Sequence, residues 1–388
     1  MRSFYKLKML IINEKIALKK FLSTNSYSFL LTTFSIAFIV WVIQSVNNLE
    51  IVSEDGHSFL VYFYYTLLIF PKIIGKILPA IFFVTLFHTL IKYENNNELK
   101  IFWINGVSKI KFYNVILKYT IIFFVIQVFI TSFLGPHLQN KAREYIKEST
   151  LDFFPSLFQE KKFIDTVEKL TIFIESKNSN NEFNNIYLKD ETNEYPRIIF
   201  AKKGELLVST KMRILRLTDG KFININKSGK ATSFNFKTTD FNLSKFLTKT
   251  TTHTKLQEKK LSMLVMCINF VLIKKETYYN QGINCNNESI NEIMSEVYTR
   301  VFKPLFLFLL SSIVIFLLSS NIENKNFNLI KGFVFSLGIV SIILSEIFVD
   351  YSGKNTSNML VAILFPLIVF FILYILFYTQ VNRANNKT

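Results

Sequence analysis

Two lysines of an apolar segment, Lys72 and Lys76, offer the clearest candidate chemistry for binding an anion. They are four residues apart, so a helix places both ammonium groups on one face. Ammonium groups at the end of an apolar helix can bind the phosphates of a lipid. Lysines at helix ends also extend to the membrane interface without any ligand, and the sequence leaves both interpretations open.

A second candidate lies in the polar connection of residues 92–112. Asn97 can cap a short helix, Glu98 would favour its positive end, and Gly106 suits a left-handed stop. The apolar side chains of this helix fall on one face and comprise Leu99, Phe102 and Trp103. Such a helix can dock into a groove of another protein or lie flat on lipid, and both alternatives remain.

Residue patterns for catalysis and nucleotide binding are absent from the sequence. There is no G-x-x-x-x-G-K-[ST] phosphate loop, no serine in a nucleophile elbow and no Cys/His cluster with zinc-ligand spacing. The chain is therefore predicted not to be an enzyme and to hold no cofactor or metal. If it moves a substrate, the energy would come from a separate subunit. Cys267 and Cys285 could pair in an oxidising compartment, or stay apart.

Six apolar runs decide the fold class, because about 20 apolar residues cross the roughly 30 Å hydrocarbon core as a helix. The predicted spans are Tyr27–Asn47, Phe70–Ile91, Tyr113–Leu134, Val301–Ser320, Ile330–Val349 and Met359–Thr379. Pro71 is predicted to divide the longer stretch Phe59–Ile91 into a surface helix and the second span. The run Leu261–Ile273 is too short to cross and is predicted to be core of the central domain.

Lysines and arginines predict the orientation of these spans. They concentrate before the first span, between the second and third, and in the tail, at Arg2, Lys6, Lys8, Lys15, Lys19, Lys20, Lys92, Lys100, Lys109, Lys111, Arg383 and Lys387. Both termini are thus predicted to be cytoplasmic and the central domain periplasmic. Much of the net charge of +17 belongs to these flanks, and no basic face with interleaved aromatics indicates nucleic-acid binding.

The central block changes from helical to strand periodicity. Short runs rich in Ile, Val, Phe and Leu comprise Leu170–Glu175, Asn185–Leu188, Arg197–Ala201, Glu205–Ser209, Arg213–Leu217, Lys221–Asn226 and Ser233–Lys237. Turn-forming pairs such as Lys203-Gly204 and Asp219-Gly220 separate them. This spacing predicts an all-β sandwich or partly open barrel.

The predicted fold is therefore a membrane α-helical bundle of six transmembrane helices, three on each side of an inserted all-β domain. Its predicted parts are a cytoplasmic amphipathic segment (1–26), spans one to three with their loop 92–112 (27–134), the periplasmic domain (135–300), spans four to six (301–379) and a cytoplasmic tail (380–388).

This organisation resembles the lipopolysaccharide-transport permease family LptF/LptG (YjgP/YjgQ), somewhat more on the LptF side. The motifs that carry the resemblance are Glu98-Leu-x(6)-Gly106-Val-Ser108, Pro136 with Lys141 and Arg143, Leu215-Arg-Leu-x-Asp219-Gly220 and Glu296-x(3)-Arg300-x(3)-Pro304-Leu305. Their order covers nearly the whole chain. The block Leu261–Glu288 departs from the family pattern.

The resemblance implies a jellyroll-like β domain and a permease subunit of an ABC transporter in the bacterial inner membrane. Such a subunit extracts lipopolysaccharide and passes it to a periplasmic bridge for outer-membrane biogenesis. It implies as partners a paralogous permease, an LptB dimer that binds ATP and Mg, the protein LptC and the bridge protein. The ATPase-coupling residues would be Glu98, Leu99, Phe102, Trp103 and Gly106.

Two other classes fit the same features. One is a permease of another ABC system that handles lipids or lipoproteins. The other is a non-transporting membrane scaffold whose periplasmic domain binds a partner.

Overall fold

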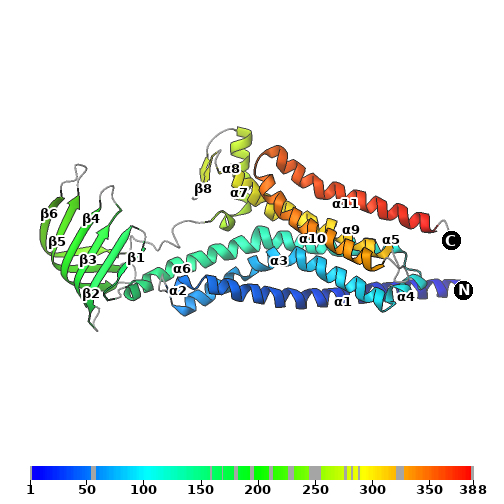
Figure 1. The fold of residues 1–388 in the computed structure, drawn as a ribbon, viewed down its shortest axis with the longest axis horizontal. Coiled ribbons are helices and arrows are strands. Elements are labelled where there is room, and N and C mark those ends of the chain that lie inside the picture. The colour runs from blue at the N-terminus through cyan, green and yellow to red at the C-terminus, as the bar shows by residue number, and fades with distance from the viewer. Residues whose placement is uncertain are drawn as a thin grey trace. The chain divides into compact units, whose positions relative to one another are not determined.

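The computed structural model describes residues 2–53, 58–157, 160–167, 169–178, 182–192, 196–208, 213–225, 231–243, 255–274, 278–280, 283–286, 289–319 and 327–385 (Figure 1). Contacts divide the chain into two compact units. The helical unit comprises Met1–Trp41, Phe70–His137 and Leu256–Thr388, and the sheet unit comprises Val42–Ile69 and Leu138–Lys255.

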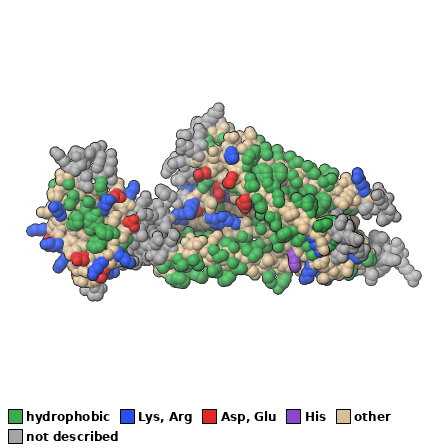
Figure 2. Space-filling view, in the orientation of Figure 1, with side chains coloured by type: hydrophobic (Ala, Val, Ile, Leu, Met, Phe, Trp, Pro, Cys, Tyr) green, Lys and Arg blue, Asp and Glu red, His purple; other side chains and the backbone are tan. Residues whose placement is uncertain are grey.

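Among the described residues, six helices are long and apolar enough to cross a bilayer, which confirms the six predicted spans. They are Lys15–Asn47, Phe59–Asn95, Lys109–Lys147, Ile290–Leu318, Phe327–Ser352 and Thr356–Arg383. In the most apolar stretch of the fourth span, 67% of the residues are buried inside the structure. The corresponding share is 17% for the first and for the sixth span. The fourth span is therefore the central helix of the unit, while the first and sixth expose apolar side chains over the helical region (Figure 2).

The elements that form the first three spans are α1 (Arg2–Asn47), α3 (Phe59–Asn95), α5 (Lys109–Phe129), the π-helical η1 (Ile130–Leu134) and α6 (Gly135–Leu157). Short helices α2 (Glu50–Ser53) and α4 (Glu98–Ile104) lie between them. The prediction that Pro71 divides the second stretch is wrong, because α3 continues through Pro71 and Pro79. The predicted amphipathic segment before the first span forms the beginning of the long helix α1.

The fourth span changes its helical type along its length. It consists of α8 (Ile290–Val297), the π-helical η6 (Tyr298–Phe302), the 3₁₀-helical η7 (Lys303–Leu305), α9 (Phe306–Ile315) and η8 (Phe316–Ser319). The fifth and sixth spans are α10 (Phe327–Ser352) and α11 (Thr356–Asn385). Pro304 near the start of η7 cannot donate a backbone hydrogen bond, which accounts for the break there.

Close packing and internal hydrogen bonds join the spans. The ring of Phe83 in α3 lies against Gly338 of α10, where a Cβ atom would be 1.9 Å from Phe83 Cζ, so glycine permits this approach. Tyr113 Oη of α5 and Ser312 Oγ of α9 are 2.6 Å apart in the buried interior. Such bonds satisfy polar groups that hydrocarbon cannot.

Six antiparallel strands form the sheet of the other unit: β1 (Phe163–Val167), β2 (Leu170–Lys177), β3 (Glu182–Asp190), β4 (Arg197–Val208), β5 (Arg213–Ile225) and β6 (Ala231–Asn242). The inserted all-β domain is therefore confirmed. Each strand pairs with its neighbours in the sequence, so the order is a meander. A jellyroll is built from Greek-key crossovers, which these six described strands do not contain.

Two dipeptides that were predicted to be turns lie inside strands of this sheet. Lys203-Gly204 and Asp219-Gly220 lie inside β4 and β5, so those two predicted turns are wrong. Asp219 has a positive φ of 51°, but pairing with β4 resumes on both sides of it, at Thr218 and Gly220. Strand pairing on both edges of β5 thus overrides the local turn preference.

One face of the sheet is a closed apolar core. Its buried side chains come from all of β2 to β5 and from the residue after β6, and comprise Leu170, Ile172, Ile174, Phe183, Ile186, Leu188, Ile199, Ala201, Leu206, Leu215, Leu217 and Leu243. The alternation of buried and exposed positions along β2 is the pattern from which a strand was predicted.

The block before the fourth span packs with helices. It contains the 3₁₀-helical η4 (Leu256–Glu258), α7 (Leu261–Asn269), the π-helical η5 (Phe270–Lys274) and the short strands β7 (Tyr278–Asn280) and β8 (Ile283–Cys285). The prediction that Leu261–Ile273 is core of the β domain is wrong, because α7 packs against α8 in the helical unit. Cys267 of α7 and Cys285 of β8 form a disulfide. Of the two alternatives that the sequence left open, the cysteines are therefore paired and not apart.

The disulfide generates a labelling prediction. The purified, unreduced chain should not react with maleimide, and it should react at both cysteines after unfolding and reduction. Because the bond joins residues 18 apart, the double substitution Cys267→Ala, Cys285→Ala should cost on the order of 3 kcal/mol of unfolding free energy. Thermal unfolding in detergent measures this loss. Cys267→Ala alone provides the control, since Cys285 then labels after unfolding without reduction. Two reactive thiols in the unreduced chain would contradict the bond.

Candidate functional site

The loop helix α4 follows a left-handed residue. Asn97 has φ 57° and ψ 16° and makes no side-chain capping bond, so the predicted cap is wrong. Asn97 instead reverses the chain between α3 and α4, a role that asparagine tolerates because its left-handed conformation costs little. At the other end Gly106 has φ 88°, as predicted for a left-handed stop. Its amide donates to the Trp103 carbonyl at 3.0 Å, which closes the helix end.

The predicted apolar face of α4 is turned into the helical unit. Leu99 and Phe102 are only 1% and 4% exposed, and both belong to its core. The Trp103 ring meets the Phe112 ring edge-on, with centroids 5.7 Å apart. These three side chains are therefore brought together, but they hold α4 onto the bundle. Whether they couple to an ATPase stays a prediction.

The exposed face of α4 carries two isoleucines that the sequence analysis missed. Ile101 is 55% exposed and Ile104 is 83% exposed. The segment ELKIFWI is apolar on both sides of the helix, so its composition alone does not tell which side faces the bundle. The docking candidate is therefore the surface formed by Ile101 and Ile104, which we call the α4 outer face.

Polar contacts tie this loop to two other spans. Lys20 Nζ of α1 lies 3.3 Å from Glu98 Oε2. Lys109 Nζ, at the start of α5, donates to the Leu318 carbonyl at 2.7 Å, at the end of the fourth span. The Lys20–Glu98 pair is partly exposed, so it contributes little stability by itself. In the structure it places the Glu98 carboxylate toward α1.

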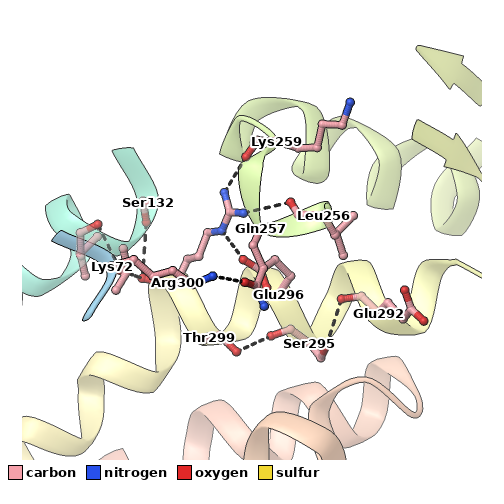
Figure 3. Close-up of polar contacts among 12 residues, drawn as sticks. Lys72, Ser132, Leu256, Gln257, Lys259, Glu292, Ser295, Glu296, Thr299 and Arg300 are labelled. Carbon is pink, nitrogen blue, oxygen red and sulfur yellow. Dashed lines mark hydrogen bonds and ion pairs between the residues drawn. The ribbon is translucent and has the colours of Figure 1, made fainter. Parts of the chain in front are cut away.

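The two candidate lysines of α3 differ in their surroundings. Lys72 is half-buried and its Nζ donates to Gln257 Oε1 of η4 at 2.6 Å (Figure 3). Lys76 is exposed. Both lie on the same side of α3, as predicted, but Lys76 has the more accessible ammonium group for an external phosphate.

Arg300 is the most deeply buried charge of this region, with 2% of its surface exposed. Its Nε donates to Glu296 Oε1 at 2.7 Å, Nη1 to the Lys259 carbonyl at 2.7 Å and Nη2 to the Leu256 carbonyl at 3.2 Å (Figure 3). The planar guanidinium can direct donors at three acceptors at once, which an ammonium cannot match in geometry. Arg300 thereby fixes η4 and the start of α7 to the fourth span.

The backbone of Arg300 holds the third span as well. Its carbonyl accepts from Thr131 Oγ1 at 2.8 Å and from Ser132 Oγ at 3.4 Å. All three residues lie in π-helical turns, η6 and η1, where the regular backbone ladder is interrupted and a side chain can insert. In the sequence, Arg300 stood out only as part of a motif that resembles the permease family. Its spacing of four from Glu296 was the signal that an ion pair forms there.

An open groove of about 670 Å³ lies on the sheet and is lined by residues of β2 to β6. Phe173, Tyr187 and Phe200 in its lining are direct cross-strand neighbours. Its polar lining includes Asn185, Lys202, Asp219 and Lys221. Figure 2 shows hydrophobic side chains gathered on one side of the sheet region, with charged side chains around them. The groove suits an amphipathic ligand, since its lining combines aromatic and polar side chains.

Metal chemistry has no candidate in the part of the chain that the structure describes. There, no group of three or more His, Cys, Asp or Glu side chains is placed to hold an ion.

A family model described as "Lipopolysaccharide export system permease LptF/LptG" matches residues 20–380, from the first span to the end of the last. The chain belongs to the LptF/LptG family. It is thus a multi-pass membrane protein of a permease family.

A Rickettsia prowazekii relative of this LptF/LptG family member is described as "Uncharacterized protein RP871". The two are 25% identical over 211 residues, which is 53% of this chain and 58% of the relative. The chain thus spans less than two thirds of that relative's length.

The Arg300 contacts generate a stability prediction. Arg300→Met would leave the Glu296 carboxylate and two carbonyls without their donor, and removing one partner of a buried pair costs about 3–5 kcal/mol. Arg300→Lys should fall between wild type and Arg300→Met, because a lysine keeps the charge but not the three-way geometry. Thermal unfolding of the purified chain measures both.

Lys303→Met serves as the matched control. It removes the Lys303–Glu346 pair of 2.6 Å, in which Glu346 is 65% exposed, so its cost should be about 1 kcal/mol or less. Equal losses for Arg300→Met and Lys303→Met would show that Arg300 is no special anchor.

Proposed function

We propose that this chain is the permease subunit of an ABC transporter that extracts lipopolysaccharide from the bacterial inner membrane. It would pass the lipid to a periplasmic bridge toward the outer membrane, with ATP hydrolysis in a separate subunit. The observation that carries the proposal is the family match over residues 20–380, which includes both sets of spans and the inserted sheet.

In this proposal the chain pairs with a paralogous permease, with both termini in the cytoplasm and the sheet in the periplasm. Lysine and arginine in the cytoplasmic loops support the orientation. The first and sixth spans each bury only 17% of their most apolar stretch inside the structure. They therefore leave apolar surface for the paralogue and for lipid.

The α4 outer face is the proposed contact with the ATPase dimer, LptB. Ile101 and Ile104 are exposed apolar side chains on a short helix, which suits a groove in another protein. Glu98 would lie at the rim of this contact, because its carboxylate is held at the first turn of α4 by Lys20. ATP and Mg would be bound by the ATPase.

The sheet is the proposed receiver of the lipid and its link to the bridge through LptC. The groove on the sheet offers aromatic and polar side chains to an amphipathic ligand. Strand β6 pairs only with β5 among the described strands, and most of its residues are exposed. An edge strand of twelve residues can add a strand from another protein by backbone hydrogen bonds.

A co-purification experiment tests the proposal as a whole. The chain isolated from its native membrane should bring down an ATPase subunit, a second permease and lipopolysaccharide, all identifiable by mass spectrometry. A permease of another ABC system would bring down an ATPase with a different lipid. A scaffold would bring down no ATPase and would not stimulate ATP turnover. That result would reject the proposal.

The coupling role of Glu98 has its own prediction. Glu98→Lys should uncouple ATP hydrolysis from lipid extraction, or release the ATPase, because it reverses the charge beside the α4 outer face. ATPase retention and extraction in proteoliposomes measure this effect.

The structure offers a charge-swapped control for the same prediction. Lys20→Glu combined with Glu98→Lys rebuilds the internal ion pair with reversed sign. If Glu98 contacts the ATPase, the double variant stays defective. Full recovery in the double variant would instead assign Glu98 a role only in the Lys20 contact.

The lysines of α3 give a further prediction about lipid phosphate. Lys76→Glu combined with Lys72→Glu should weaken photocrosslinking of lipopolysaccharide to the complex, because two cations on one side of α3 become anions. Lys76→Glu alone should cause most of the loss, since Lys72 is engaged with Gln257. Lys354→Glu, at another exposed lysine, is the control. Unchanged crosslinking with normal membrane insertion would reject the phosphate role.

A further inference from the structure

We propose that α7 is an interfacial helix, whose exposed face lies among the phospholipid headgroups and upper acyl chains at the level of Arg300. The occupant of this face is the bilayer surface. The proposal needs the spans to lie in a membrane, but it does not depend on lipopolysaccharide being the substrate.

The two sides of α7 differ in burial. Leu264, Cys267 and Val271 face inward and pack with residues of α8 in one apolar cluster. On the opposite side Val265 is 49% exposed, Met266 53% and Leu272, in η5, 38%. Helical spacing places these three side chains on one strip, and the polar residues Ser262 and Asn269 are exposed on the same strip. A mixed apolar and polar strip is typical of helices that lie in the membrane interface.

Two constraints fix the level of α7 along the spans. At its beginning, the Lys259 carbonyl accepts from Arg300 Nη1 at 2.7 Å, and Arg300 belongs to the fourth span. Along its length, the cluster that buries α7 includes Ile290 and Ile293 of α8 and reaches Met359, in the first turns of the sixth span. The helix therefore packs at the ends of two spans, where hydrocarbon gives way to headgroups.

A disulfide also holds α7 in this place. The Cys267–Cys285 disulfide joins the inward side of α7 to β8. Within the same cluster Cys285 is buried beside α8 residues. The exposed strip is thus presented by a helix that is anchored at its start by Arg300 and in its middle by the disulfide.

Charge at the start of α7 fits a phospholipid surface. Lys259 and Lys260 directly precede the helix, after the acid Glu258, and Lys260 is exposed. Ammonium groups beside an apolar strip bind anionic headgroups while the strip enters the acyl boundary.

Tryptophan quenching in the full chain tests this placement. With Trp41→Phe and Trp103→Phe as the background, Val265→Trp is reconstituted into vesicles of phosphatidylcholine and phosphatidylglycerol without lipopolysaccharide. Bromines near the headgroup end of the acyl chains should quench its emission more than bromines deep in the chains. Val340→Trp, in the fifth span and 49% exposed, is the control for deep quenching. Phe234→Trp, on the sheet and 60% exposed, is the control for a site outside lipid.

Each outcome decides the proposal. Shallow-weighted quenching of Val265→Trp, or of Met266→Trp where the first variant does not assemble, supports it. Emission as insensitive to bromine as that of Phe234→Trp overturns it. Quenching weighted to deep bromines, as for Val340→Trp, also overturns it and assigns α7 to the hydrocarbon core. Lys260→Glu should lower the dependence of the quenching on phosphatidylglycerol. None of these results bears on lipopolysaccharide transport, which the co-purification experiment tests separately.

Discussion

Hydrocarbon gives the backbone no hydrogen-bonding partner, and the helical unit follows from that constraint. Each of the six spans satisfies its own backbone as a helix and has few charged groups in its most apolar stretch. The exceptions are informative, because they occur where other side chains complete the hydrogen bonding. The π-helical turns η1 and η6 meet at the Arg300 carbonyl, which accepts from Thr131 and Ser132. The interruption of regular helix is thus located where side chains of the third span bond to the backbone of the fourth.

Sequence reasoning succeeded where a single physical effect dominates. The spans were predictable because length and apolar character alone decide them, and the inserted sheet because strand periodicity recurs at even spacing. Gly106 was predictable as a left-handed stop, since glycine has no Cβ penalty there. The family resemblance rested on motifs in these same elements.

It failed where two effects compete and only packing decides. Pro71 removes one hydrogen bond, but α3 continues because the segment on each side is strongly apolar and helical. Asp219-Gly220 favours a turn, but the pairing of β5 with both β4 and β6 keeps it in a strand. The face of α4 that meets the bundle could not be predicted, because apolar side chains occupy both sides. The sequence indicated the contacts of Arg300 only through its spacing of four from Glu296. Its carbonyl partners at Leu256 and Lys259 could not be predicted, because they are more than forty residues away in sequence.

The contacts of the loop helix bear on how a force at its surface would reach the spans. Leu99 and Phe102 lock α4 into the core of the helical unit, and Glu98 is paired with Lys20 of the first span. At the other end of the loop, Lys109 is bonded to the Leu318 carbonyl of the fourth span. A loop held at both ends and along its inner face moves as part of the bundle, because a close-packed core resists local deformation. A displacement of Ile101 and Ile104 would therefore be passed to the first and fourth spans together, and not absorbed by bending of the loop.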